Sequence, residues 1–182
     1  MDQGQIAQSE PWLAVGREIA ETLARVRANA FESFVDIFRD QGRRWFFSGQ
    51  GRSGLVAEMA AMRFMHIGRA AHLVGEATAP SIRTGDGLCV ISGSGKTSVS
   101  VHFSRIAKGE GARIALITRE LDSELAKFAD VVLHTPIEIT RQFGGSLFEQ
   151  TSLILLDAIV LELMRDISDA HQLMLSRHTN LQ

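Results

Sequence analysis

Five short apolar runs, separated by segments with helical spacing, limit what this chain can fold into. The runs are rich in β-branched and aromatic residues and cover residues 43–49, 70–75, 86–92, 112–118 and 130–136. Between them, apolar residues recur at the spacing of an amphipathic helix, most clearly over residues 53–68, 96–111 and 123–129. Strands that alternate with helices pack as a parallel sheet covered on both faces. We therefore predict an α/β fold in which a five-stranded parallel sheet is flanked by helices.

The two ends of the chain predict further helices outside this alternating pattern. Apolar residues at helical spacing over residues 12–39 follow Ser9 and Pro11, which are typical start signals, and indicate one long helix or two. Another long helix is predicted over residues 146–165. A chain of 182 residues is about one domain long. We expect a single domain with an N-terminal helical segment (1–41), an α/β core (42–167) and a C-terminal helix and tail (168–182).

Composition and charge narrow the class of protein. With 45% hydrophobic residues, 22% charged residues and a net charge of −2, the chain resembles an ordinary soluble globular protein. It lacks the strong basic field that favours nucleic acid. The N-terminus has no apolar signal core, and no apolar stretch reaches membrane-spanning length. We expect a cytoplasmic protein with no nucleic-acid or membrane partner, in which the single Cys89 is a core residue.

The segment Gly95-Lys96-Thr97 looks like the end of a nucleotide-binding P-loop. That motif needs a glycine five residues before Gly95, but Val90 occupies this position within a predicted strand, so ATP binding is not expected. The loop of residues 92–97 still predicts an anion site. Its two glycines let the backbone approach a ligand, and its hydroxyls stand beside the N-terminus of a helix. The alternative is a simple turn in which a Ser or Thr only caps the helix.

A second glycine-rich loop, residues 48–54, follows the first predicted strand. In a parallel sheet both loops lie at the carboxyl ends of strands, where ligands bind in the crevice at which the strand order reverses. Gly49, Gly51 and Gly54 formally match the dinucleotide-binding pattern. That pattern also needs an acidic residue at the end of the second strand, and only Glu76, beyond the strand, is near. The sequence therefore does not favour a bound NAD.

Several motifs in their order along the chain resemble one known family. They are GQGRSGLVAEMAAMRFMHIG, VGEATAPSIRTGD, ISGSGKT, GSLFEQTSLILLDAIVLELM and the terminal RHTNLQ. From about residue 42 onward the chain resembles the 6-phospho-3-hexuloisomerases, members of the wider sugar isomerase (SIS) group. The resemblance implies an SIS-type, flavodoxin-like three-layer sandwich and a homotetramer with shared active sites. It also implies interconversion of 3-hexulose 6-phosphate and fructose 6-phosphate in the ribulose monophosphate pathway, with no cofactor and no metal.

The resemblance assigns roles to both glycine-rich loops. The loop of residues 92–97 is expected to hold the sugar phosphate, through Ser92, Gly93, Ser94, Gly95, Lys96 and Thr97. Lys96 fills a variable position of the motif, so its ammonium either assists binding or faces solvent. Gly51, Arg52 and Ser53 are expected to form the other wall of the pocket, with Ser53 contacting the substrate. For Arg52, a surface or intersubunit ion pair is an equally good interpretation.

The same resemblance predicts Glu149 as the catalytic base and His178 as a second catalytic residue. The residues alone favour another role for Glu149, because Ser146-Leu147-Phe148-Glu149 has the spacing of a capping box. The family match favours the base. His178 corresponds to a C-terminal histidine that in this group can reach a neighbouring subunit's site, whereas the alternative is a solvated tail. Histidine is the side chain that most readily gains and loses a proton near neutral pH, which suits it to move a proton on the sugar.

The sequence does not predict a metal site, and it leaves two other functions open. No metal site is expected, since no two of the other histidines form a ligand spacing with a nearby carboxylate; these are His66, His72, His102, His134 and His171. One alternative function is isomerisation of another phosphosugar, such as arabinose 5-phosphate. The other is a non-catalytic, regulatory SIS domain that binds a sugar phosphate. A regulator needs an output, and the N-terminal segment is not a basic nucleic-acid reader.

Overall fold

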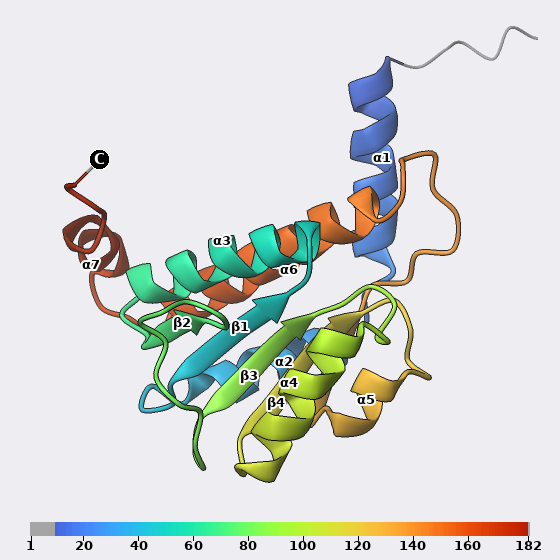
Figure 1. Cartoon of the computed structure of the whole chain (residues 1–182). Coiled ribbons are helices and arrows are strands. Elements are labelled where there is room, and N and C mark those ends of the chain that lie inside the picture. The colour runs from blue at the N-terminus through green and yellow to red at the C-terminus, as the bar shows by residue number, and fades with distance from the viewer. Residues whose placement is uncertain (1–9, 182) are drawn as a thin grey trace, which may run out of the picture.

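A computed structural model describes residues 10–181 and contains one five-stranded sheet (Figure 1). All strand pairs are parallel, and the strand order is β2-β1-β3-β4-β5. The strands are β1 (Trp45–Gly49), β2 (Ala71–Leu73), β3 (Gly87–Ile91), β4 (Arg113–Thr118) and β5 (Val131–His134). The predicted α/β fold class is confirmed, because each apolar run forms a strand of this sheet.

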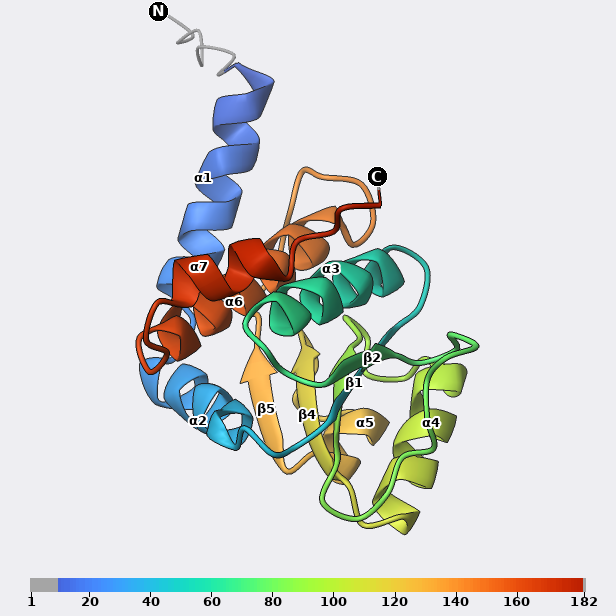
Figure 2. The same ribbon diagram turned by 90° about the vertical axis from the view of Figure 1, so that its left-hand side faces the viewer.

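Helices cover both faces of the sheet, which gives three layers (Figures 1 and 2). One face is covered by α2 (Ala28–Arg39), α3 (Arg52–His66) and α6 (Ser146–Met164). The other face is covered by α4 (Ser98–Gly109) and α5 (Glu124–Phe128). Helix α7 (Ala170–Ser176) contacts α3, and α1 (Pro11–Ala24) contacts α6. Beyond that contact, α1 extends away from the rest of the molecule in both views.

The N-terminal apolar pattern forms two helices, and the chain turns between them at residues 25–27. No glycine or proline marks this break. The turn lets α2 run along the sheet, so that Phe34 and Phe38 become fully buried. Pro11 begins α1, as predicted, while Ser9 and the rest of the N-terminal segment predicted to lack a signal core, residues 1–9, lie outside the described residues.

The core contains an aromatic cluster that leaves no room for a side chain at one neighbouring position. The ring of Phe38 packs 4.1 Å from that of Trp45 and 4.7 Å from that of Phe64, centroid to centroid. The indole of Trp45 lies over Gly87 on the neighbouring strand, where any side chain would collide with it. Cys89 is fully buried beneath the same layer, and burial raises the pKa of its thiol. Such a cysteine is a packing residue, because the reactive form is the thiolate.

The strand order places both glycine-rich loops at one point of the sheet. After β1 the chain passes to α3 on one face, and after β3 it passes to α4 on the other face. Since β1 and β3 are neighbours, the two loops leave adjacent strand ends toward opposite faces of the sheet. This switch point is where an α/β sheet of this order binds its ligand.

Candidate active site

The loop of residues 92–97 folds as a tight turn between β3 and α4. Its conformation depends on Gly95, which has a φ of 62° and packs against Ser123, so that a side chain there would collide. The backbone N–H of Gly95 donates to the carbonyl of Ser92 (3.2 Å), and the Gly95 carbonyl accepts from the N–H of Leu125 (3.0 Å). The loop is therefore held in one shape by α5 as well as by its own strand.

The hydroxyls of this loop are not used as helix caps. Thr97 occupies the N-cap position of α4 and makes no side-chain capping hydrogen bond. Its Oγ1 lies 3.3 Å from the Oγ of Ser92, and the Oγ of Ser94 accepts from the N–H of Lys96 at 3.3 Å. The simple capping alternative is thus not what the chain adopts. Three hydroxyls and the free N–H groups of the first turn of α4 stand together, a combination suited to an oxyanion.

The loop of residues 48–54 brings Arg52 to the first position of α3. Gly51 has a φ of 57° and a ψ of −127°, a conformation that residues with a side chain rarely adopt. A side chain at Gly49 would collide with the backbone of Ser53, which shows how closely the loop folds over the end of β1. Ser53 is half-buried in the second position of α3. Both glycines serve to hold the start of α3 against the sheet.

Arg52 forms an ion pair with Glu149 at the start of α6. The Nε of Arg52 lies 2.9 Å from Oε2 and 3.0 Å from Oε1 of the carboxylate. The side chain of Glu149 is 17% exposed and that of Arg52 is 49% exposed, so the carboxylate is the sheltered partner. Arg52 therefore does form an ion pair, and its partner lies in the same chain. The pair also places a cation beside the predicted base, where it can stabilise negative charge that develops on a bound substrate.

The predicted capping box at residues 146–149 does not form. Helix α6 begins at Ser146 with Gly145 as N-cap, and no side chain caps it. The Oγ of Ser146 donates instead to the carbonyl of Phe143 at 2.8 Å. The carboxylate of Glu149 lies beside Gly145 and pairs with Arg52, and within residues 10–181 it accepts no hydrogen bond from a backbone N–H of the first turn. The structural role that competed with catalysis for Glu149 is therefore absent.

Gly93 connects the two halves of the site. A side chain at Gly93 would lie 3.2 Å from the ring of Phe148, the residue before Glu149, and 3.4 Å from the Nε of Arg119. The backbone N–H of Arg119 donates to the Gly93 carbonyl at 3.2 Å. The loop of residues 92–97 and the start of α6 are thus in direct contact. The structure brings together Ser92, Gly93, Ser94, Gly95, Lys96, Thr97, Gly51, Arg52, Ser53 and Glu149.

Arg119 was not predicted as a site residue. It directly follows β4, at the same end of the sheet as the two glycine-rich loops. Its Nε is buried and has no hydrogen-bond partner among residues 10–181. A buried guanidinium N–H without a partner is costly unless something else satisfies it. The sequence signal was present, since an arginine ends a buried strand at the carboxyl edge, but no motif drew attention to it.

His178 is not brought to this site within one chain. Its imidazole stacks on that of His66, with ring centroids 5.5 Å apart and planes 6° apart. His66 is the last residue of α3, and Arg52 is the first, so the length of the helix, roughly 20 Å, separates the two ends. Burial, then the charges of His178 and Arg63, lower the pKa of His66. The exposed His178 lies on the outer surface, beyond reach of Glu149 in its own chain.

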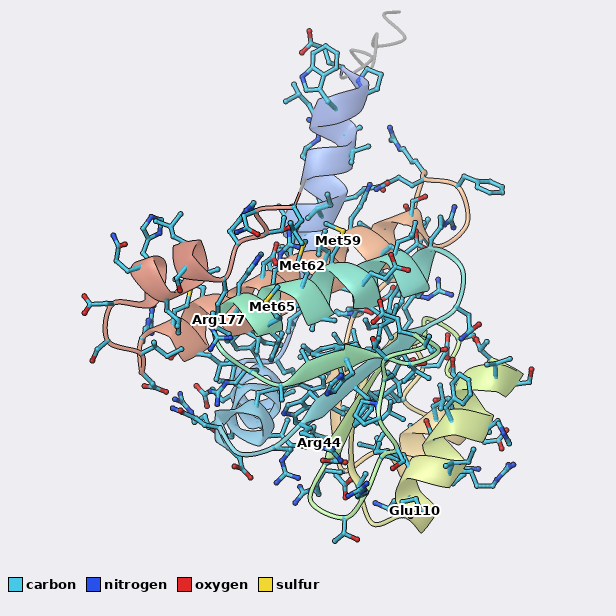
Figure 3. The ribbon with its side chains drawn as sticks, turned by 60° about the vertical axis from the view of Figure 1, so that its left-hand side comes forward. Arg44, Met59, Met62, Met65, Glu110 and Arg177 are labelled. Carbon is cyan, nitrogen blue, oxygen red and sulfur yellow. The ribbon has the colours of Figure 1, made fainter. Side chains whose placement is uncertain are left out.

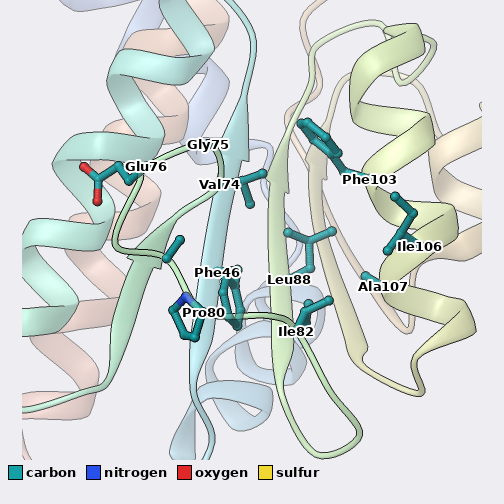
Figure 4. Close-up of a pocket in the computed structure, with 11 residues that line it drawn as sticks. Phe46, Val74, Gly75, Glu76, Pro80, Ile82, Leu88, Phe103, Ile106 and Ala107 are labelled. Atoms are coloured by element: carbon teal, nitrogen blue, oxygen red, sulfur yellow. The ribbon is translucent and has the colours of Figure 1, made fainter.

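A separate cavity lies on the α4 side of the sheet (Figure 4). It has a volume of about 250 Å³ and lies between α4 and the segment that follows β2. Its walls include Phe46, Leu88, Phe103 and Ile106, and the exposed Glu76 is the one ionisable residue among those that line it. It contains neither member of the Arg52–Glu149 pair and no residue of the loop of residues 92–97. Its apolar walls offer nothing to hold a phosphate.

Comparison with known proteins places this chain in a family. A sequence model described as SIS domain matches residues 37–163, which is most of the chain. The chain belongs to the SIS domain family. The SIS match spans all five strands and both glycine-rich loops, and it ends near the end of α6. The resemblance predicted from the motifs is confirmed.

Four relatives of this SIS domain chain are named 3-hexulose-6-phosphate isomerase, and others are uncharacterised. A 3-hexulose-6-phosphate isomerase of Mycobacterium gastri is 40% identical over 173 residues, covering 91% of this chain and 86% of the relative. One from Bacillus subtilis is 38% identical over 146 residues, covering 75% and 79%. A solved structure from Methanococcus jannaschii, a hypothetical protein for which the function of 3-hexulose-6-phosphate isomerase was inferred, has a TM-score of 0.82 at 29% identity, covering 94% of this chain and 98% of the other.

Two further features of the SIS domain chain bear on partners. None of the helices within residues 10–181 has both the length and the apolar character needed to cross a bilayer. Over the same residues, side chains of His, Cys, Asp and Glu nowhere gather in threes in the way that a metal ion requires.

Proposed function

We propose that this protein interconverts 3-hexulose 6-phosphate and fructose 6-phosphate. The observation that carries the proposal is the Arg52–Glu149 pair beside the loop of residues 92–97, at the switch point of the sheet. A carboxylate and a cation next to an anion-binding loop are what an isomerase of a phosphorylated sugar needs. The names of the relatives support the same substrate.

The reaction moves a carbonyl group between C3 and C2 of the sugar. Glu149 removes the proton from C2, and the electron pair of that bond forms the C2–C3 double bond of an enediolate. Arg52 stabilises the negative charge on the enediolate oxygen. Transfer of the O2 proton to O3 and return of the carbon-bound proton to C3 then give a ketone at C2 and a hydroxyl at C3, so the sugar is oxidised at C2 and reduced at C3 with no external oxidant. One carboxylate can serve both carbon proton transfers.

The phosphate group supplies binding energy away from the reacting carbons. Ser92, Ser94 and Thr97 donate hydroxyl hydrogen bonds, and the first turn of α4 contributes N–H groups. Fixing the phosphate at this loop holds C2 in line with Glu149, which lies across the contact of Gly93 with Phe148. Lys96 is exposed and adds a positive charge at the edge of the loop.

His178 acts, in this proposal, from a neighbouring subunit of a homotetramer. Large apolar side chains are exposed on the helical layer that α1, α3, α6 and α7 form: Trp12, Leu13, Leu55, Met62, Ile154, Leu161 and Leu175. Met59, Met62 and Met65 line the outer side of α3 (Figure 3). Apolar patches of this kind mark protein interfaces. Packing of two such layers would carry His178 of one chain toward the Arg52–Glu149 pair of another. We propose that the assembled protein is a cytoplasmic enzyme of the ribulose monophosphate pathway.

The proposed substrate is tested with a panel of phosphosugars. Purified protein without added metal or nucleotide should convert 3-hexulose 6-phosphate to fructose 6-phosphate, followed directly by formation of the product. Arabinose 5-phosphate should be turned over far less efficiently, and ATP should not compete with fructose 6-phosphate for binding. Preferential turnover of arabinose 5-phosphate would contradict the substrate, and tight binding of fructose 6-phosphate with no turnover would point to a regulatory domain.

Arg119 is expected to bind the phosphate as well. Because its buried Nε has no partner among the described residues and lies on Gly93, Arg119→Gln should weaken binding of inorganic phosphate and raise KM by about 10-fold, with a smaller change in kcat. Calorimetry with phosphate measures the loss. Arg105→Gln, which removes the same charge from the exposed side of α4, serves as the control. Equal weakening in both variants would reduce the effect to net charge.

A further inference from the structure

The N-terminal helix reaches the active-site region through one carboxylate. Oε2 of Glu18, on α1, accepts from the Oγ1 of Thr140 at 2.7 Å and from the Nε2 of Gln142 at 3.1 Å. Its Oε1 accepts from the backbone N–H of Arg141 at 2.9 Å. Three consecutive residues of the segment between β5 and α6 are thus bound to a single side chain more than a hundred residues away. Both carboxylate oxygens of Glu18 are occupied.

Arg25, at the C-terminal end of α1, binds the same segment closer to its first residue. Arg25 donates from Nη2 to the carbonyl of Pro136 at 2.6 Å and from Nη1 to Glu138 at 3.2 Å. This segment, residues 135–145, has no helix or strand of its own and carries the exposed Ile139 and Phe143. With few packed side chains, it depends on these hydrogen bonds for a fixed position.

The far end of segment 135–145 forms the wall behind the catalytic pair. A side chain at Gly144, whose φ is 61°, would lie 3.0 Å from the Nη2 of Arg52. One at Gly145 would lie 3.1 Å from the Oε1 of Glu149. The backbone at these two glycines therefore lies directly against the Arg52–Glu149 pair. A shift of the segment by an ångström would change the space available to both side chains.

We infer that Glu18 is a positioning residue for the active site, which holds segment 135–145 so that Gly144 and Gly145 pack against Arg52 and Glu149. The inference rests on the proposed role of Glu149. Glu18 takes no part in the chemistry, because its two oxygens already accept three hydrogen bonds from the segment. It gives α1 a function within its own chain, apart from any contact with a neighbouring subunit.

Glu18 is ionised at neutral pH, so its hydrogen bonds to segment 135–145, here called the clamp, are present throughout that range. The backbone N–H of Arg141, followed by the hydroxyl of Thr140, lowers the pKa of Glu18, and the charge of Arg141 acts in the same direction. A carboxylate with a lowered pKa contributes its stability above the unfolded value of about 4.3 and loses it as the pH falls through the folded value. The clamp is therefore fully formed between about pH 6 and pH 8, and its removal should cost the same activity throughout this range.

The test compares Glu18→Ala with Glu21→Ala. Glu21 is exposed on the same helix, and its side chain makes no hydrogen bond or ion pair with any residue in 10–181. Glu18→Ala should lower kcat by about 10-fold at both pH 6 and pH 8, since misplacement of a catalytic group by an ångström is costly. It should also speed hydrogen exchange at the amide of Arg141, with unchanged oligomeric mass. Glu21→Ala should stay within about 2-fold of the unmodified protein.

A second variant covers the case in which Glu18→Ala does not fold. Thr140→Val leaves α1 unaltered and removes the hydroxyl that donates to Glu18 and accepts from the N–H of Gln142, so it should lower kcat in the same direction. Combined with Glu18→Ala, it should cost less than the sum of the two single losses, because both variants break the Glu18–Thr140 hydrogen bond. Full activity of Glu18→Ala with a freely exchanging segment would overturn the inference, as would activity lost only together with a change in mass. Activity retained by Glu149→Gln would instead contradict the proposed base, whatever the exchange result.

Discussion

Glu149→Gln should lower the turnover of 3-hexulose 6-phosphate by roughly 10²-fold or more, which is what a positioned general base contributes. Glutamine keeps the size of the side chain and can still accept a hydrogen bond from Arg52, but it cannot take the C2 proton. Binding of fructose 6-phosphate and thermal stability should change little, since the phosphate loop is untouched. Steady-state kinetics, calorimetry and a melting curve measure the three quantities.

Two comparisons make the Glu149→Gln result specific. Glu58→Gln, on the exposed side of α3, replaces a carboxylate outside the site and should have near-normal activity. Arg52→Gln breaks the same ion pair and leaves the base in place, so its kcat should exceed that of Glu149→Gln. Near-normal isomerisation by Glu149→Gln would show that another residue transfers the proton. Equal losses in Glu149→Gln and Arg52→Gln would mean that the pair matters only as a pair.

His178→Ala should lower kcat by about 10²-fold as well, if the imidazole moves the hydroxyl proton during isomerisation. The effect should fall on kcat more than on KM, because the phosphate is bound elsewhere. His171→Ala, which removes an exposed histidine from α7, is the matched control and should be silent. A silent His178→Ala would leave the C-terminal histidine as a surface residue that stacks on His66.

Mixing the two inactive variants tests whether sites are shared between chains. If Glu149 of one chain works with His178 of its neighbour, mixed oligomers of Glu149→Gln and His178→Ala contain some sites with both groups intact. When equal amounts of the two variants assemble at random, about a quarter of the shared sites contain both intact groups, so about a quarter of the normal activity should return. Light scattering should report four chains. No recovery in mixed oligomers of confirmed composition would contradict the shared site.

The alternation of strands and helices could be predicted because each strand is a buried run that carries its own signal. The five runs, including the fully buried β3, became the five strands, and the glycines at positions 49, 51, 93 and 95 marked the two loops at the carboxyl ends of β1 and β3. The break between α1 and α2 carried no such signal. It is set by the need to lay Phe34 and Phe38 on the sheet, and not by a local breaker.

Contacts between distant residues could not be predicted from local patterns. Glu149 has the spacing of a capping residue, but Arg52, 97 positions earlier, offers a charged partner that the helix N-terminus cannot match. Glu18 looked like any acid on an exposed helix face, and its three donors lie 122 to 124 positions later. Arg119 carried no motif at all. Such pairings depend on the strand order, which no short segment of sequence contains.

The strand order also determines when each strand can pair during synthesis on the ribosome. After β2, each strand that emerges can pair with one already made, because β3, β4 and β5 are added outward in turn. Nascent chains grow at about 5–20 residues per second and fold as they emerge. Glu149 follows the last strand, so both glycine-rich loops are made seconds before the carboxylate that we propose as the base. Docking of α6, and with it the attachment of segment 135–145 to α1, therefore comes after the whole sheet has been made.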